Sequence, residues 1–433
     1  MTRWSRITVL AMTLLVPSLD ALGELRFPPP EFESGYQFPQ TTAPGAKAVF
    51  HEYIDSAVLL AALLLATYLI LRRRSRRAIF ALMLLALVYF GFWRDGCICP
   101  IGAIQNVTLT ISDGSYAIPI TAGIFFVLPL VFTLFVGRIF CGAVCPLGAI
   151  QDAVLLHPVA VPRWLESGLR LMAYTYLGLA VLFAAIGNSF VICRYDPFIG
   201  FFRLSGNWNI LIIGTSVLLI GLFIGRPYCR FLCPYGILLR QMSRLSKWRV
   251  TITPNECVKC RLCEGACPFG AIREPTGDWP RGEYKVAKRR LALLLLLLPI
   301  LVAAGGWGGY ALKERLARVH PKVRTAERVY LEDTGKVEGT TNASDAFRAT
   351  GRTREDLYQD ATAIRGRFAV GGALLGGFLG LVAGGKLVAL SVRRRRSEYE
   401  ADRAGCFACG RCYQYCPKER ERRKKNKETV AGH

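Results

Sequence analysis

The sequence predicts an all-α integral membrane helix bundle of about seven spans, joined to a small cytoplasmic α+β module that is split in sequence. Three observations lead to this fold class. The 433 residues are 52% hydrophobic, above the roughly 45–50% usual in chains that fold in water. Apolar stretches of nearly bilayer-spanning length recur along the chain. Most of the 15 cysteines fall in C-x-x-C or C-x-x-x-C-P groupings, which suit metal binding better than disulfides.

The chain begins with the features of a targeting segment. Arg3 and Arg6 precede an apolar run and a small-residue site near Gly23, so we expect residues 1–23 to form a secretory signal peptide or an uncleaved anchor. Residues 24–53 are polar and rich in proline, and we expect them to form an exterior arm. Seven candidate spans follow, at residues 54–71, 78–93, 117–136, 171–192, 209–224, 291–310 and 368–390.

These spans divide the rest of the chain into units. We expect a membrane bundle over residues 54–249 and the first half of the α+β module over 250–285. Two further spans, within 286–310 and 368–392, enclose an exterior loop over 311–367. The second half of the module and a basic tail then occupy residues 393–433.

The formal net charge of +24 is unevenly distributed between the two predicted sides of the membrane. If the arm lies outside, the interior segments 72–77, 137–170, 225–290 and 391–433 carry 35 Lys and Arg against 13 Asp and Glu, whereas the exterior segments and Asp55 carry 17 of each. This asymmetry follows the positive-inside rule. It predicts a multi-pass protein of the bacterial inner (cytoplasmic) membrane, with the module and the C-terminus in the cytoplasm. The lipid bilayer then accounts for the charge, and we expect no nucleic-acid partner.

Two cysteine runs match the bacterial ferredoxin pattern C-x2-C-x2-C-x3-C-P, in which the fourth cysteine ligates the other cluster. We therefore expect two 4Fe-4S clusters in a bacterial-ferredoxin-like module. The two spans between the runs are an even number, so both halves return to the same side. A pair of zinc sites is the alternative. The expected ligand sets are Cys257, Cys260, Cys263 and Cys416 for one cluster, and Cys406, Cys409, Cys412 and Cys267 for the other.

A second motif, G-R-x-aromatic-C-x3-C-P-x-G, occurs twice at the cytoplasmic ends of spans, at residues 137–148 and 225–236. Two cysteine pairs at equal depth supply four ligands, which predicts a third 4Fe-4S cluster. Arg138 and Arg226 are expected either near the negative charge of this cluster or at lipid headgroups. The expected ligands are Cys141, Cys145, Cys229 and Cys233.

Weaker copies of this motif occur on the exterior side. Residues 94–105 echo the stretch that contains Cys145, and residues 193–198 echo the stretch that contains Cys229. Two hypotheses stay open for these cysteines. One is a fourth cluster on Cys97, Cys99 and Cys193, completed by Asp196 or Asp95; the other is a disulfide between Cys97 and Cys99, or thiols without a role.

Over residues 78–275 and 406–417 these motifs resemble the membrane polyferredoxins of the NosR and NapH type, which are 4Fe-4S electron-transfer proteins. The resemblance implies electron transfer between the quinone pool or a cytoplasmic donor and periplasmic redox proteins. The chain departs from NosR-type proteins in two respects. The arm before the first span has no room for their N-terminal flavin domain, and the exterior cysteines do not carry over from that family.

The sequence argues against several other cofactors. The four histidines are His51, His157, His320 and His433, and none lies in a predicted span, so an intramembrane haem lacks axial ligands. No C-x-x-C-H is present for attached haem. The 311–367 segment contains no motif that we recognise for covalent flavin; we expect it to dock a partner or to cap the bundle. The four glycines of the last span, Gly372, Gly376, Gly380 and Gly384, are expected to pack within the bundle.

The expected function is transmembrane electron transfer through several 4Fe-4S clusters. A cytoplasmic ferredoxin-like donor or a quinol would supply the electrons, and a periplasmic redox protein or flavoprotein would accept them. The chain is then an electron-transfer component of an oxidoreductase system, such as a quinol dehydrogenase subunit. Two alternatives stay open: a redox-sensing or maturation protein for an exterior metalloenzyme, and a membrane thiol-disulfide relay.

Overall fold

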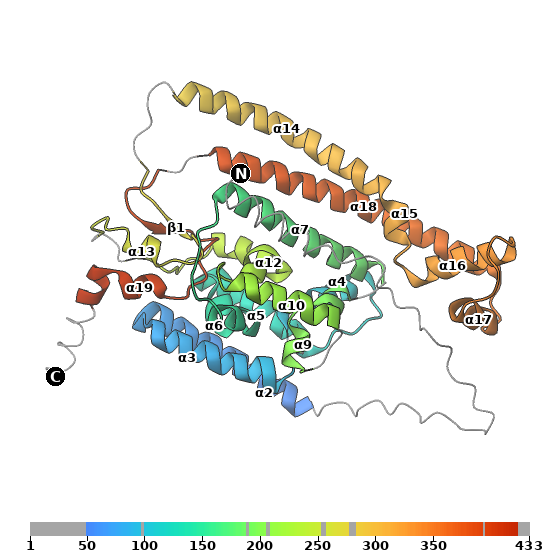
Figure 1. Cartoon of the computed structure of the whole chain (residues 1–433), viewed down its shortest axis with the longest axis horizontal. Coiled ribbons are helices and arrows are strands. Elements are labelled where there is room, and N and C mark those ends of the chain that lie inside the picture. The colour runs from blue at the N-terminus through green and yellow to red at the C-terminus, as the bar shows by residue number, and fades with distance from the viewer. Residues whose placement is uncertain are drawn as a thin grey trace.

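The computed structural model describes residues 49–96, 99–187, 190–204, 208–252, 257–276, 283–392 and 395–422. The expected signal segment over 1–23, and the arm up to residue 48, lie outside these ranges. Within them the chain is mostly helical and contains one two-stranded sheet. The long helices run side by side, with α13, α19 and β1 at one end of the molecule and α16 and α17 at the other (Figure 1).

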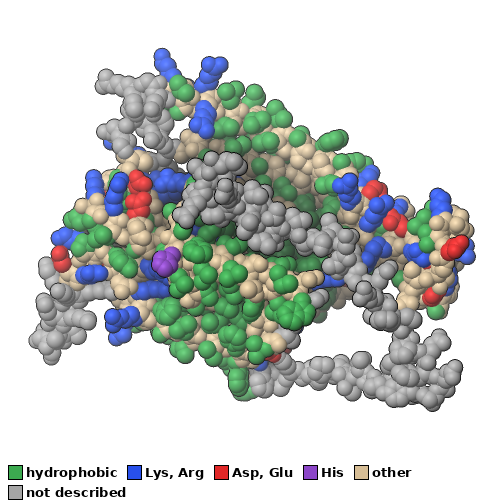
Figure 2. Space-filling model, viewed as in Figure 1, with side chains coloured by type: hydrophobic (Ala, Val, Ile, Leu, Met, Phe, Trp, Pro, Cys, Tyr) green, Lys and Arg blue, Asp and Glu red, His purple; other side chains and the backbone are tan. Residues whose placement is uncertain are grey.

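In the part of the chain that the structure describes, five helices are long and apolar enough to cross a membrane, by length and composition. On the face drawn in Figure 2, hydrophobic side chains cover the middle of the molecule, and most Lys and Arg side chains lie toward its two ends. Apolar residues belong in the hydrocarbon core and cations at its edges, so this distribution fits a membrane protein. The five stretches are Glu52–Arg73, Arg76–Trp93, Arg163–Ala185, Tyr284–Ala311 and Arg354–Ser391.

The remaining two expected spans form shorter helices, α5 (Ile120–Val136) and α10 (Trp208–Gly221). Helix α5 begins after Pro119 and ends at Gly137, which adopts a φ of 85°. The span expected at 171–192 is α7 (Arg163–Ala185); it ends early because Gly187 adopts a φ of 74°. The first two long stretches contain α2 (Val49–Tyr68) and α3 (Arg76–Ala86), continued by the π-helical turns η1 (Leu69–Arg73) and η2 (Leu87–Trp93).

The Cys-Pro motifs each start a helix. Cys99, Cys145 and Cys233 occupy N-cap positions, and the following proline is the first residue of α4 (Pro100–Ser112), α6 (Pro146–Ala153) and α12 (Pro234–Arg244). Proline suits this position because its missing N–H would have no partner there. The motif therefore directs the first backbone N–H groups of a helix toward a sulfur, as the N–H of Gly236 is directed toward Sγ of Cys233. The other short elements here are η3 (Phe140–Val144), α8 (Val191–Tyr195), α9 (Ile199–Phe202) and α11 (Pro227–Phe231).

Helices α14 (Glu283–Ala311) and α18 (Arg354–Ser391) pack closely against each other through glycines. A Cβ atom on Gly309 would lie 1.9 Å from the carbonyl oxygen of Gly372, and one on Gly305 would lie 2.3 Å from that of Gly376. Only glycine permits backbones to approach this closely. The prediction that the glycine stripe packs within the chain is therefore confirmed.

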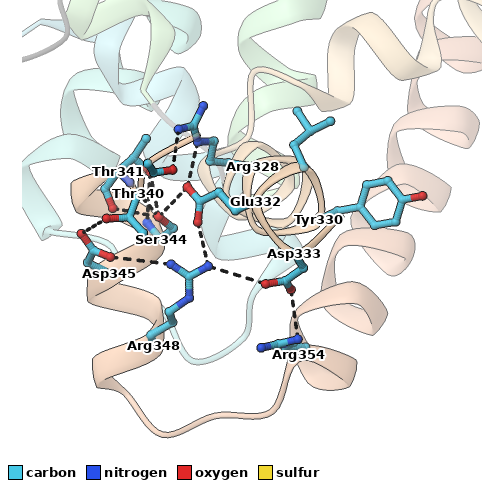
Figure 3. A network of polar contacts seen from close by, with 12 residues as sticks. Arg328, Tyr330, Glu332, Asp333, Thr340, Thr341, Ser344, Asp345, Arg348 and Arg354 are labelled. Carbon is cyan, nitrogen blue, oxygen red and sulfur yellow. Dashed lines mark hydrogen bonds and ion pairs between the residues drawn. The ribbon is translucent and has the colours of Figure 1, made fainter. Parts of the chain in front are cut away.

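The 311–367 segment folds into helices α15 (Lys313–Ala317), α16 (Pro321–Asp333) and α17 (Asn342–Ala349), with the first turns of α18. Its apolar side chains, among them Val323 and Val329, form one cluster with Leu182 and Phe183 of α7. On the outer side, Glu332 accepts hydrogen bonds from Arg328 at 2.8 Å and Arg348 at 2.7 Å (Figure 3). The segment is thus a folded cap on the end of α7.

The two halves of the α+β module pack together although helices α14 to α18 separate them in sequence. Strand β1 (Ile272–Arg273) pairs antiparallel with β2 (Glu400–Ala401), with Ile272 opposite Ala401. Helix α13 (Leu262–Gly265) lies in the first half and α19 (Arg411–Tyr415) in the second. The α14–α18 hairpin leaves and re-enters the module at the same end of the molecule (Figure 1). An even number of long helices permits this return.

Candidate metal centres

One cavity in the bundle is lined by all four cysteines of the repeated membrane motif. Cys141 lies in η3, Cys229 in α11, and Cys145 and Cys233 at the starts of α6 and α12. Each is at most 8% exposed. The two copies of the motif, about ninety residues apart in the chain, therefore direct two sulfurs each into one enclosed space. We refer to these four residues as the membrane cysteine group.

Hydrogen-bond donors point at these sulfurs. The Nε2 atom of Gln151 lies 3.3 Å from Sγ of Cys229, and the backbone N–H of Gly236 lies 3.2 Å from Sγ of Cys233. An Arg138 guanidinium nitrogen lies 3.8 Å from Sγ of Cys141. Donors and a cation stabilise anionic sulfur, and thiolates bound to iron have this character. The donor set and its surroundings therefore fit an iron-sulfur cluster.

Both motif arginines are buried, Arg138 at 3% and Arg226 at 0% exposed, so they do not lie at the lipid surface. Arg226 has a left-handed backbone, with a φ of 52°, and donates to the carbonyl oxygen of Cys141. Its guanidinium group also lies 3.5 Å from the carboxylate of Asp152. Of the two positions expected for these arginines, the one beside the cysteines is confirmed.

Asp152 joins the bundle to the α+β module. Besides Arg226, its carboxylate accepts hydrogen bonds from Arg76 of α3 at 2.8 Å and from Arg411 of α19 at 3.2 Å. Burial alone would raise the pKa of Asp152, but the charges of the three arginines lower it to about 2. Asp152 is therefore ionised at neutral pH and fixes three cations, each of which adjoins an expected ligand in sequence or in space.

The exterior motif repeats this arrangement in part. Gln105 accepts from the backbone N–H of Ile192 at 3.0 Å, just as Gln151 accepts from that of Tyr228 at 3.0 Å, and each of these donors precedes a cysteine. The tandem repeat of the sequence is therefore also a repeat of structure. Unlike Gln151, Gln105 has no partner for its buried Nε2 atom.

The exterior residues lie near one another as far as they are described. Cys99 lies close enough to Cys193 and Asp196 for their charges to act on it, and Cys193 lies beside the first turn of α4. Asp196 is 5% exposed, whereas the alternative ligand Asp95 is exposed. Cys97 lies outside the described residues. Cys99 also lines the cavity of the membrane cysteine group, so the exterior set adjoins that group directly.

In the α+β module, a second cavity is lined by all four members of the first expected ligand set. They are Cys257, Cys260, Cys263 and Cys416. Cys263 is buried and Cys260 is exposed to solvent. Burial, and then the three neighbouring cysteines, raise the pKa of Cys263 to about 11. A bare thiolate is therefore disfavoured here, and a cationic partner such as iron would restore it.

The second ligand set surrounds the other half of the module. Cys267, Cys406, Cys409 and Cys412 lie close enough for their charges to interact. Burial raises the pKa of Cys406 to about 12. The first set is adjacent, because the charge of Cys263 acts on Cys412. The described residues contain no group of three or more His, Cys, Asp or Glu side chains spaced for a single metal ion. These four-cysteine groups are the candidate centres.

The two cysteine runs have the same backbone conformation. Lys259 and Arg261 of the first run have φ values of 52° and 64°, and Ala408 and Gly410, at the equivalent positions of the second, have 54° and 73°. Left-handed residues that alternate with right-handed ones turn successive N–H groups toward one concave side, an arrangement that binds anions and iron-sulfur clusters. Three of these four residues are not glycine, so the conformation carries strain that the fold maintains.

The second run rests directly on the membrane cysteine group. A Cβ atom on Gly142, between Cys141 and Cys145, would lie 2.1 Å from the carbonyl oxygen of Phe407. The Phe407 ring is tilted against that of Phe269, with the ring centroids 4.8 Å apart, and it lies 4.2 Å from the guanidinium group of Arg138. Sequence reasoning missed these contacts and the role of Asp152. The one available signal was the glycine within C-G-A-V-C, which has no side chain to block the approach.

Comparisons with known proteins agree with this chemistry. A family described as a 4Fe-4S binding domain matches residues 118–163, 207–253 and 263–286, and a second family with the same description matches residues 250–273. The chain carries ferredoxin-type 4Fe-4S domains. The first two matched stretches each contain one copy of the repeated membrane motif. The 250–273 match contains the whole first ferredoxin run, and the 263–286 match contains its last two cysteines.

Two curated proteins are similar over these regions. YccM of Escherichia coli, whose name describes an electron transport protein, is 30% identical over 118 residues, which are 25% of this chain and 33% of YccM. Protein NirI of Paracoccus denitrificans is 33% identical over 124 residues, or 28% of this chain and 18% of NirI. The chain thus spans a third or less of either relative. No solved structure matches it. The resemblance to membrane 4Fe-4S electron-transfer proteins is confirmed.

Proposed function

We propose that this chain moves electrons one at a time across the bacterial inner membrane. A cytoplasmic ferredoxin-like protein or a quinol would donate them, and a periplasmic redox protein or flavoprotein would accept them. The 4Fe-4S domain matches and the similarity to an electron transport protein support electron transfer. Burying an isolated charge in hydrocarbon is prohibitive, so electrons need carriers on both sides of the bilayer and within it.

We assign a cluster to each of the three four-cysteine groups, and a fourth to the exterior set of three cysteines and one aspartate. When bound, such clusters would each take up and release one electron. The assignments follow the spacing of the motifs and the cavities that the cysteines line. The proposed ligand sets are Cys257, Cys260, Cys263 and Cys416; Cys267, Cys406, Cys409 and Cys412; Cys141, Cys145, Cys229 and Cys233; and, on the exterior side, Cys97, Cys99, Cys193 and Asp196.

The observation that carries the proposal is the contact between Phe407 and Gly142, because it joins the soluble module to the membrane cysteine group. Contacts on either side of it support a fixed order of sites. Cys260 of the first set is exposed to solvent, and the charge of Cys263 in the same set acts on Cys412 of the second set. On the other side, Cys99 of the exterior set lines the cavity of the membrane cysteine group. The four sites would then form one series from solvent to the exterior side.

Side chains around the membrane cysteine group would stabilise the negative charge of a bound cluster and exclude water. Arg138 and Arg226 supply two buried cations, and Gln151 donates to a sulfur. These groups favour the more negative, reduced state of a bound cluster. The buried, mutually tilted rings of Phe269 and Phe407 fill the space between this group and the second ligand set, so bulk water is kept out of that interface.

Counting metal after anaerobic purification tests the assignments. The full chain should contain about 12–16 irons, with equal acid-labile sulfide, for three to four clusters. The Cys141→Ser/Cys229→Ser double variant should lose about four irons and keep the signals of the ferredoxin-type clusters. Thr215→Ala, on the exposed side of α10, is the control and should retain full iron. Fewer than about four irons in the wild-type chain would contradict the proposal and favour a thiol relay.

A further inference from the structure

Four basic side chains from four helices gather around one buried carboxylate. Glu166 accepts hydrogen bonds from Arg170 of α7 and, at 2.9 Å, from Arg230 of α11. Lys386 of α18 donates to the carbonyl oxygen of Ser167 at 2.7 Å. The charges of Arg170 and Arg240 of α12 act on Lys386. We refer to Arg170, Arg230, Arg240 and Lys386 as the basic cluster.

The basic cluster has more positive charge than its surroundings balance. Among the residues that the structure describes, Glu166 is the one carboxylate that the basic cluster contacts. Asp402 also acts on Arg170 and Arg240, but it lies 3.5 Å from Arg273. The side chain of Arg230 is 3% exposed and that of Arg170 is 13% exposed. Like charges gathered away from water repel each other and lose hydration, so a counter-anion would stabilise this arrangement.

Hydrogen-bond donors in the basic cluster also lack partners. Within the described part of the chain, the buried Nε and Nη1 atoms of Arg230 and the buried Nε atom of Arg170 have no hydrogen-bond partner. Among the described residues, Arg230 alone has a terminal guanidinium nitrogen in this condition. Arg230 follows Cys229 but does not line the cavity of the membrane cysteine group, which Arg138 does. The unpartnered donors of Arg230 are therefore not accounted for by a cluster in that cavity.

We propose that the basic cluster binds a phosphate-bearing anion, supplied either by an acidic lipid headgroup or by free inorganic phosphate. Guanidinium groups match phosphate geometry with paired N–H donors, and a lysine adds a compact charge. Basic sites between membrane helices on the cytoplasmic side bind acidic headgroups in this way. The anion would join α7, α11 and α12 of the bundle to α18, whose nearby contacts with α7 are largely apolar.

Lipid exchange on the full chain tests this site. The purified protein would be offered phosphatidylglycerol or phosphatidylcholine in detergent, and retained lipid would be counted by native mass spectrometry. Melting temperatures would be compared in sodium phosphate and sodium chloride of equal ionic strength. The wild type should retain phosphatidylglycerol preferentially. Arg240→Gln/Lys386→Gln should weaken retention about tenfold or more, because two cations are removed.

Arg163→Gln is the matched control, because Arg163 is exposed at the start of the same helix α7. It should retain lipid as the wild type does, and iron content should show that every variant is folded. Stabilisation by inorganic phosphate without lipid retention would support the anion site and identify free phosphate as its source. The proposal is overturned if neither phosphatidylglycerol nor phosphate binds the wild type more tightly than the double variant. It is also overturned if Arg163→Gln loses as much retained lipid as the double variant.

Discussion

The inner bundle and the α14–α18 hairpin differ in what their helices bury: the bundle buries charged side chains, and the hairpin buries glycine backbone. The bundle from α2 to α12 buries charge: Arg226, Arg138 and Asp152 are all at most 3% exposed and lie beside cysteines. The hairpin has no cysteine between residues 283 and 392, and its helices meet through glycine backbones. One region is built to hold charged groups in low dielectric. The other returns the chain to the module, so that two distant cysteine runs complete each other's sites.

This difference predicts where substitutions are costly. In the bundle, removing one member of a buried ionic network leaves its partners uncompensated, which costs more than the interaction itself contributes. In the hairpin, the cost comes from steric overlap, because no side chain fits between the two backbones. On the exposed surface of the cap, ion pairs are screened by water and contribute little.

The largest effect is expected from Asp152→Asn. Arg226, Arg76 and Arg411 would lose the carboxylate that they share, at a cost of about 3–5 kcal/mol in the free energy of unfolding. Because Arg411 belongs to α19, the module should also separate from the bundle more readily. Denaturant unfolding and protease sensitivity of residues 395–422 measure both effects. Asp345→Asn, on the exposed cap, is the control; equal stability of the two variants would refute the role of Asp152.

The second effect concerns the hairpin. Gly309→Ala places a methyl group 1.9 Å from the carbonyl oxygen of Gly372, so α14 and α18 must move apart, at a cost of about 1–3 kcal/mol. Gly308→Ala, at the adjacent residue, meets nothing within 4 Å and is the matched control. The melting temperature should fall for Gly309→Ala and should stay unchanged or rise for Gly308→Ala. The reverse order would show that the hairpin packs differently.

A third effect separates charge from packing in the bundle. Arg138→Gln removes the cation 3.8 Å from Sγ of Cys141. Because a cation favours the reduced cluster, its loss should lower the midpoint potential of the membrane site by roughly 50–100 mV. Redox titration followed by electron paramagnetic resonance measures this shift. The midpoint potentials of the ferredoxin-type signals should change less, and Arg163→Gln should change no midpoint potential. An equal shift of all the midpoint potentials in Arg138→Gln would contradict the placement of Arg138.

The smallest effect is expected in the cap. Arg354 pairs with Asp333 at 3.3 Å, but its side chain is 61% exposed. Arg354→Gln should therefore change the free energy of unfolding by at most about 1 kcal/mol. Together with Asp152→Asn, this variant tests whether burial, rather than the presence of an ion pair, decides the energetic cost. Thermal unfolding of the two variants side by side is the measurement.

The sequence was sufficient for patterns that are local or periodic. The C-x2-C-x2-C-x3-C-P spacing predicted which cysteines gather in the module, the repeated G-R motif predicted the membrane cysteine group, and the spacing of Gly372 and Gly376 predicted close helix packing. What it could not provide depends on long-range contacts. No local signal pairs Phe407 with Gly142, gives Asp152 three arginines, or brings Cys99 to the membrane cavity. The helices of the 311–367 cap were missed, although the buried residues Val323, Ala326 and Val329 recur at helical spacing and were a local signal for α16.

The proposed cluster sites should form one conducting series across the membrane, and electron transfer in proteoliposomes is the measurement that decides this. The chain would be oriented with its module facing a membrane-impermeant reductant, with an impermeant acceptor enclosed on the other side. The expectation is that the wild type and Thr215→Ala reduce the acceptor, and that Cys141→Ala reduces it no faster than protein-free vesicles. Transfer by Cys141→Ala at the wild-type rate, or none by an iron-loaded wild type, would contradict it.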